Sequence, residues 1–134
     1  MSYTLPRSER LRSLKAIRRM FGEGHSGFVY PFRYVWVVAE PSDEGVEVQP
    51  CSERGVEVMF SVPKKFHKRA NKRNLLKRRT REAYRLNREA LCGQLQQGGK
   101  RINMAFIYST KEIHSYKTVE NAVQRILAQV CERL

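Results

Sequence analysis

Acidic residues are scarce in this 134-residue chain, which has 13 Asp and Glu against 26 Lys and Arg. Asp43 is its single aspartate, and the glutamates are scattered along the sequence. Metal-dependent nucleases hold their ions with clustered carboxylates, in many sites with two ions about 4 Å apart. The sequence therefore predicts no tightly bound metal and no independent catalytic centre of this kind in the protein.

Patterns typical of other catalytic sites are missing as well. His25, His67 and His114 are isolated, and no paired-histidine spacing suggests acid–base cleavage. A lone histidine beside a basic run, such as His67, is more often a surface residue than a catalyst. The sequence has neither a P-loop nor a nucleophile elbow, so little catalytic machinery is visible in the protein alone.

Long apolar runs and cysteine motifs are absent too. The sequence contains no run of 18 apolar residues, the length that could span a bilayer. The segment MSYTLPRSERLRSLK lacks the apolar core of a secretory signal. Cys51, Cys92 and Cys131 are odd in number and form no C-x-x-C pair, which argues against a disulfide framework or a zinc site. We therefore expect a cytoplasmic protein with reduced thiols and no membrane partner.

Positive charge, by contrast, is concentrated in one segment, KKFHKRANKRNLLKRRTREAYRLNR, which runs from Lys64 to Arg88. This segment holds 12 of the 26 Lys and Arg and a single acid, Glu82. The net charge of +13 and the pI of about 10.2 indicate attraction to nucleic acid. Such a density of cations predicts a polyanionic partner.

On a helix at about 100° per residue, this segment divides into a basic face and a mostly apolar face. The basic face consists of Arg73, Asn74, Lys77, Arg78, Arg81, Arg85 and Arg88. The packing face consists of Leu76, Thr80, Ala83, Asn87, Ala90 and Leu91. Like charges four residues apart destabilise a helix by about 0.2–0.5 kcal/mol per pair, which a bound anion would offset. A merely solvated basic helix is the alternative, and the lack of interleaved acids argues against it.

The spacing A-x-x-R-N-x-x-K-R-x-x-R-E-x-x-R, which begins at Ala70, resembles the signature of the bacterial ribonuclease P protein subunit. In that family a strand ends in a Lys-Lys pair and precedes a helix with an Arg-Asn, Lys-Arg and Arg core. Here these segments are VMFSVPKK, ending at Lys65, and RNLLKRRTRE, beginning at Arg73. The segment RL-x(5)-I-x(3)-F, which ends at Phe21, matches as well. Pro63 departs from the family pattern, as do Ile17 and a long 40–53 loop.

Turn residues and periodicity predict one RNA-binding α+β domain over 1–134, a two-layer sandwich in the order α-β-β-β-α-β-α. The expected elements begin with a helix from a Ser13 cap to Phe21, with Leu14, Ile17 and Phe21 on one side, a strand over Phe28–Ala39 that Pro31 divides or whose edge it marks, an acidic loop at about 40–55 and a strand over Val56–Val62. A basic motif helix at about 67–97, a strand over Ile102–Tyr108 and a helix capped by Thr118 follow. The last helix has an apolar stripe of Val119, Ala122, Val123, Ile126, Leu127 and Val130. The resemblance implies a left-handed β-α-β crossover, although base rates favour a right-handed one.

The resemblance also implies a function. In the family an RNA subunit performs hydrolytic, endonucleolytic removal of the 5′ leader from precursor tRNA, the protein assists, and Mg²⁺ is held mainly by the RNA. Arginine forks and lysine charges match phosphates. The residues expected to bind the catalytic RNA are Lys64, Lys65, Lys68, Arg69, Arg73, Asn74, Lys77, Arg78, Arg81 and Arg85.

A single-stranded leader requires a different surface, with aromatic side chains for stacking and scattered positive charge. In the family it lies in a cleft between the first helix and the sheet, where Ile17 and Phe21 match cleft positions. Alternation along the following strand leaves two faces open. These are Arg33, Val35 and Val37, or Tyr34, Trp36 and Val38. Core packing is the alternative role for Phe21 and Trp36.

Three other functions compete with tRNA processing. A ribosomal or other structural RNA-binding protein would share the charge and size, but it would need neither the Arg-Asn motif nor a leader cleft. A DNA-binding regulator could use a basic helix, yet a stripe of Arg and Lys with one Asn favours phosphate contacts over base recognition, so we expect no DNA partner. A protein-only nuclease would need the missing carboxylates.

Overall fold

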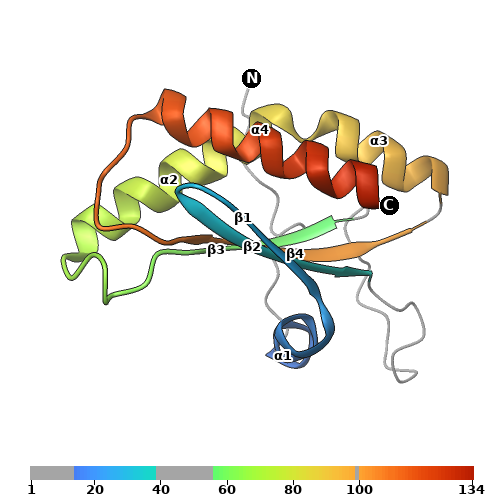
Figure 1. Cartoon of the computed structure of the whole chain (residues 1–134), viewed down its shortest axis with the longest axis horizontal. Coiled ribbons are helices and arrows are strands. Elements are labelled where there is room, and N and C mark those ends of the chain that lie inside the picture. The colour runs from blue at the N-terminus through green and yellow to red at the C-terminus, as the bar shows by residue number, and fades with distance from the viewer. Residues whose placement is uncertain (1–13, 39–55, 99) are drawn as a thin grey trace.

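The computed structural model describes residues 14–38, 56–98 and 100–134, and it shows one four-stranded sheet with helices on both faces (Figure 1). The elements are α1 (Leu14–Glu23), β1 (His25–Val29), β2 (Phe32–Val38), β3 (Val56–Ser61), α2 (Ala70–Asn87), α3 (Glu89–Gly98), β4 (Ile102–Tyr108) and α4 (Tyr116–Arg133). Helices α2, α3 and α4 lie together on one face, and α1 lies alone on the other. The predicted α+β class is confirmed. The 40–55 loop, Cys51 and the Ser13 cap lie outside the described residues.

The strand order in the sheet is β1-β2-β4-β3. Strand β2 pairs antiparallel with both β1 and β4, whereas β3 pairs parallel with β4. Parallel neighbours need a crossover connection, and α2 and α3 provide it. The carboxyl ends of β3 and β4 therefore lie at the same end of the sheet, where the β1–β2 turn also lies.

Pro31 divides the first predicted strand into β1 and β2, as expected, because proline cannot donate to a ladder. The hairpin begins earlier than predicted, at His25. Gly27 allows this extension, since a Cβ atom there would lie only 2.5 Å from the ring of Tyr34. Glycine thus leaves room for a buried tyrosine to pack across the edge strand.

The main core lies between the sheet and the helices α2, α3 and α4. Its sheet side includes Phe32, Phe106 and Tyr108, whose rings meet edge to face. The predicted apolar stripe of the last helix is fully confirmed as buried: Val119, Ala122, Val123, Ile126, Leu127 and Val130. The predicted start of that helix was wrong. The cap is Ser115, whose Oγ accepts from the Thr118 backbone N–H at 3.4 Å.

The single basic helix expected at about 67–97 is two helices, α2 and α3, joined at Arg88. Figure 1 shows a change of direction between them. At the end of α2, the side-chain Nδ2 of Asn87 donates to the carbonyl oxygen of Ala83 at 2.7 Å. This bond competes with the backbone for an acceptor one turn earlier, and such side-chain bonds bend or end helices.

A second, smaller core attaches α1 to the opposite face of the sheet. It consists of Met20, Val35, Val37 and Ala105, with Ala16, Ile17 and Met59 packed against it. The sequence placed Leu14, Ile17 and Phe21 on the packing side of this helix. Leu14 is instead 60% exposed and Phe21 48% exposed, and Met20 is the residue that α1 buries completely.

Candidate RNA-binding surfaces

Helix α2 presents its basic stripe on the flank that faces away from α4. The opposite flank is tied to α4 and to the loop before it. There Arg79 donates to the backbone oxygen of His114 at 2.5 Å, and Asn87 bonds to Glu120 and Gln124. Arg79, in the middle of the basic segment, is therefore a structural residue. The predicted residues Lys77, Arg78 and Arg81 lie on the other flank.

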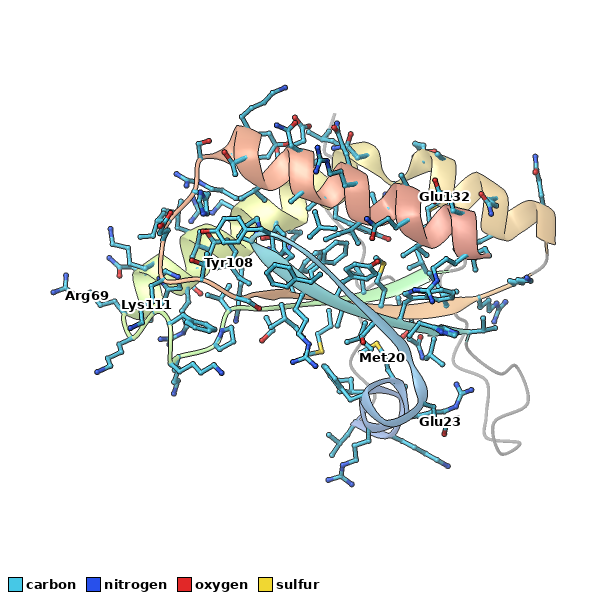
Figure 2. The ribbon with its side chains drawn as sticks, in the orientation of Figure 1. Met20, Glu23, Arg69, Tyr108, Lys111 and Glu132 are labelled. Atoms are coloured by element: carbon cyan, nitrogen blue, oxygen red, sulfur yellow. The ribbon has the colours of Figure 1, made fainter. Side chains whose placement is uncertain are left out.

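A group of exposed cations lies around the start of α2, after the end of β3. The predicted residues that are exposed there are Lys64, Lys65, Lys68, Arg69, Asn74 and Arg78. Lys77 and Arg81 are partly exposed. Figure 2 shows Arg69 pointing outward from this end of the molecule. Lys111 follows Thr110, whose backbone oxygen lies 2.8 Å from Nε2 of His67 in the loop before α2. Lys111 was missed in the sequence because it belongs to the loop after β4, which only the parallel β3–β4 pairing brings here.

Arg73 has a role that its place in the motif does not reveal. Its Nη1 donates to the backbone oxygens of His67 and Lys68, at 3.0 and 2.8 Å. His67, expected on the surface, is instead buried, and its Nε2 lies 2.8 Å from the oxygen of Thr110. These bonds fasten the lysine-bearing loop before α2, so Arg73 stabilises the surface as well as extending it.

Two further arginines of the stripe are less available than predicted. Arg85 forms an ion pair with Glu82, and its side chain is only 11% exposed. Arg88 is buried at the junction of α2 and α3. Helical spacing placed both on the basic face, but the ion pair with Glu82 and the break in the helix at Arg88 leave them less exposed.

A second surface lies on the sheet face that carries α1. Cross-strand pairing places Phe28, Arg33, Ile107 and Ser61 in one row on this face. The adjacent row on the same face contains Val35 and Ala105, which α1 covers. Phe28 and Arg33 are exposed, and Ile107 and Ser61 are partly exposed. The sheet is therefore open beside α1.

The flanks of α1 show how the helix lies on this face. Arg19 donates to the backbone oxygen of Val38 at 3.2 Å, at the end of β2 remote from the β1–β2 turn. Ile17 and Phe21 lie on the other flank of the helix, which therefore faces the open row. Figure 1 shows α1 nearly end on, with its axis across the strands.

This geometry decides between the two strand faces that the sequence left open. Arg33, Val35 and Val37 share the face with α1. Tyr34 and Trp36 are buried in the main core on the opposite face, so they do not line the surface beside α1. The hydroxyl of Tyr34 donates to Gln129 of α4 at 2.5 Å. Phe28, Ile107 and Ser61 of the open row were missed because they belong to three different strands. The alternation of residues within a strand does not show which strands pair.

Met20 packs against the sheet residues Val35 and Ala105, and Figure 2 shows its place beside α1. We expect Met20→Ala to lower the free energy of unfolding by about 2–5 kcal/mol, because it removes a completely buried side chain from a small cluster. Thermal or chemical denaturation measures this loss. Arg18→Ala, at an exposed position of the same helix, is the control and should change stability little. Equal stability of the two variants would show that α1 is not held by Met20.

Residues 14–38, 56–98 and 100–134 contain no group of three or more His, Cys, Asp and Glu side chains placed to hold a metal ion. None of the helices there is long and apolar enough to cross a membrane. Burial raises the pKa of the Cys131 thiol, which keeps it protonated at neutral pH.

Together these features define a small basic α+β protein with a cationic loop and helix on one side and an open sheet face beside a short helix. The family model described as Ribonuclease P matches residues 5–131. The chain belongs to the ribonuclease P protein family. Membership implies a part in tRNA 5′ processing by a ribonucleoprotein endoribonuclease.

Curated relatives agree with this assignment, and a solved structure shares the fold. The chain is 36% identical over 129 residues to the ribonuclease P protein component of Porphyromonas gingivalis strain W83, covering 96% of this chain and 88% of the relative. It is 32% identical over 114 residues to that of Chlorobaculum tepidum, covering 80% and 68%. The fold matches the RNase P protein of Staphylococcus aureus with a TM-score of 0.62 at 16% identity, covering 91% and 94%. The strand order and crossover are consistent with that fold.

Proposed function

We propose that this protein binds the catalytic RNA of ribonuclease P and the 5′ leader of precursor tRNA, and that it assists endonucleolytic removal of the leader. The exposed cations around the start of α2, including Lys64, Lys68 and Arg78, would contact phosphates of the catalytic RNA. The open row from Phe28 to Ser61, with Ile17 and Phe21 beside it, would hold the leader. In this proposal the protein acts in the cytoplasm, as part of a hydrolase whose other component is RNA.

The observation that carries this proposal is that two different surfaces meet at one place. The open row ends at Ser61, the last residue of β3, and the chain continues directly into the loop that carries Lys64 and Lys65. An RNA strand lying on the row would therefore run toward the cationic loop. This continuity suits a protein that holds a substrate strand beside a docked RNA.

The chemical step is assigned to the RNA subunit. The chain has a single aspartate, Asp43, and the residues that the structure describes hold no group of three or more His, Cys, Asp and Glu side chains placed to bind a metal ion. We therefore propose that the Mg²⁺ ions are held mainly by RNA and that the protein binds none tightly. Its own contribution is positioning: cations orient the two RNAs, and exposed rings hold unpaired bases.

Phe21 provides the test of leader binding. The holoenzyme, formed from this chain and its catalytic RNA, should bind precursor tRNA with a leader more tightly than mature tRNA. Phe21→Ala should reduce the ratio of the two affinities by about 5- to 150-fold, since stacking on one base is worth about 1–3 kcal/mol. Affinities for the two substrates, measured in parallel, give the preference directly.

Because Phe21 is 48% exposed, its truncation should cost little stability, and a melting curve checks this. Phe60→Leu is the control, because the Phe60 side chain is partly buried and packs against the main core. This change should lower stability without a selective effect on leader binding. A Phe21→Ala holoenzyme with normal melting and an unchanged preference would remove this residue from the leader surface. A wild-type protein with no leader preference would favour a structural RNA-binding role instead.

A further inference from the structure

Three aromatic side chains lie on the surface where β1 meets the β1–β2 turn. Phe28 is 59% exposed and Tyr30 is 51% exposed, and their ring centroids are 6.5 Å apart. The ring of His114, from the loop after β4, lies 5.3 Å from Tyr30 in an edge-on contact. Phe28 belongs to the open row beside α1, so these rings extend that row to the end of the sheet.

Hydrogen bonds hold this group in place. The hydroxyl of Tyr30 lies 3.1 Å from Nε2 of His114 and 3.3 Å from Oγ1 of Thr110. The His114 backbone is fixed in turn, because its oxygen accepts from Arg79 and its N–H donates to the Tyr108 hydroxyl. The exposed rings therefore need little ordering when a ligand binds, which favours affinity.

The surrounding charges favour an anionic ligand. Arg33 is the cross-strand partner of Phe28 and is exposed, and Lys111 lies in the same loop as His114. One carboxylate is close: Oε2 of Glu112 lies 3.7 Å from Nε2 of His114. Exposed rings interspersed with cations are the features that bind unpaired nucleotides, where bases stack on rings and phosphates meet positive charge.

A structural role alone would explain the Tyr30 hydroxyl, since it joins the turn to the 109–115 loop. It would not explain why Phe28 exposes a large ring on an edge strand, where exposed apolar surface is usually avoided. Tyr30 also exposes half of its surface although its hydroxyl is bonded. The two properties of Tyr30, its hydroxyl and its ring, can be separated by mutation.

We propose that Phe28, Tyr30 and His114 form a second stacking site for leader RNA, which takes nucleotides beyond those held beside Ile17 and Phe21. This proposal rests on the proposed function, because it assigns a longer binding surface to the same leader. It predicts that affinity rises with leader length until the strand reaches the turn. It also predicts that the rings of Phe28 and Tyr30, rather than the Tyr30 hydroxyl, produce the second part of that rise.

The experiment measures the affinity of the holoenzyme for precursor tRNAs with leaders of one nucleotide and of about ten nucleotides, a length within the range that folded single-strand-binding domains occupy. Wild type is compared with Tyr30→Leu, Phe28→Leu and the double variant. Tyr30→Phe is the matched control, since it keeps the ring and removes the hydroxyl. Melting curves accompany every variant.

We expect the double variant to lose about 5- to 150-fold in affinity for the long leader and almost nothing for the short one. Tyr30→Phe should bind both like wild type, even if it melts earlier. Unchanged long-leader affinity in the double variant would overturn the second site while leaving leader binding intact. Equal losses for both leaders, or a loss in Tyr30→Phe that matches Tyr30→Leu, would show that the group only fastens the turn. A wild-type holoenzyme indifferent to leader length would overturn both proposals.

Discussion

Purified protein should leave precursor tRNA intact in Mg²⁺, and leader cleavage should begin only when the catalytic RNA is added. The expectation follows from the shortage of carboxylates in the sequence, because two-metal phosphodiester cleavage needs several of them at one place. The measurement is cleavage of end-labelled precursor tRNA by protein alone, by RNA alone and by the mixture. The mixture should give a product with the mature 5′ end.

Two controls make this comparison decisive. Heat-treated catalytic RNA that has lost its fold should fail to support cleavage in the mixture, and an unrelated basic protein should not replace this chain at low Mg²⁺ concentration. Leader removal by protein free of RNA, sensitive to chelation of Mg²⁺, would contradict the assignment of chemistry to the RNA. It would then require a metal site built from residues that sequence reasoning did not identify.

The second large effect concerns the cationic surface at the start of α2. Replacing Lys64, Lys68, Arg69 and Arg78 together by Ala should weaken binding to the catalytic RNA by roughly 30- to 1,000-fold at low salt, taking about 0.5–1 kcal/mol for each exposed contact. Each lost phosphate contact should also reduce the salt slope of log K by about 0.7–0.9. Affinity measured over a salt series gives both quantities. All four side chains are exposed, so the fold should survive.

A control with the same loss of charge separates local contacts from net charge. Arg101, Lys117, Arg125 and Arg133 are exposed cations located after the end of α3, outside the basic segment. Replacing them by Ala should change the affinity and the salt slope much less. Similar losses in the two variants would mean that the catalytic RNA responds only to overall charge. Arg73 is left out of the test set because its bonds to His67 and Lys68 would confuse stability with binding.

Much of the fold could be predicted because its signals are local. Strand β4 was predicted with the correct bounds, since INMAFIY is compact and flanked by polar residues. The apolar stripe of α4 follows the helical period, and a stripe of that width must pack against something. Pro31 marked the division of the hairpin because proline removes a ladder donor. In each case a few neighbouring residues carry the information.

The site was predicted less completely because its geometry depends on distant partners. Arg73 was predicted on the basic face, yet its side chain bonds to the preceding loop. Arg79, in the same basic segment, bonds to the backbone of His114. Alternation in β2 gave two faces, and only the position of α1 shows which one is open. Phe28 and Lys111 joined the surfaces through strand pairing, which links residues far apart in the sequence.

The two cores of unequal size give the proposed RNA-binding surfaces different mechanical properties. The cations of α2 belong to a helix that packs into the large core, so separating this helix from the sheet would expose many buried side chains. Helix α1 rests on a small cluster around Met20, and segments with few buried contacts open at low free-energy cost. One wall of the proposed leader surface is therefore easier to displace than its floor and the adjoining cations. In the proposed complex, α1 would adjust to leaders of different sequence without shifting the protein on the catalytic RNA.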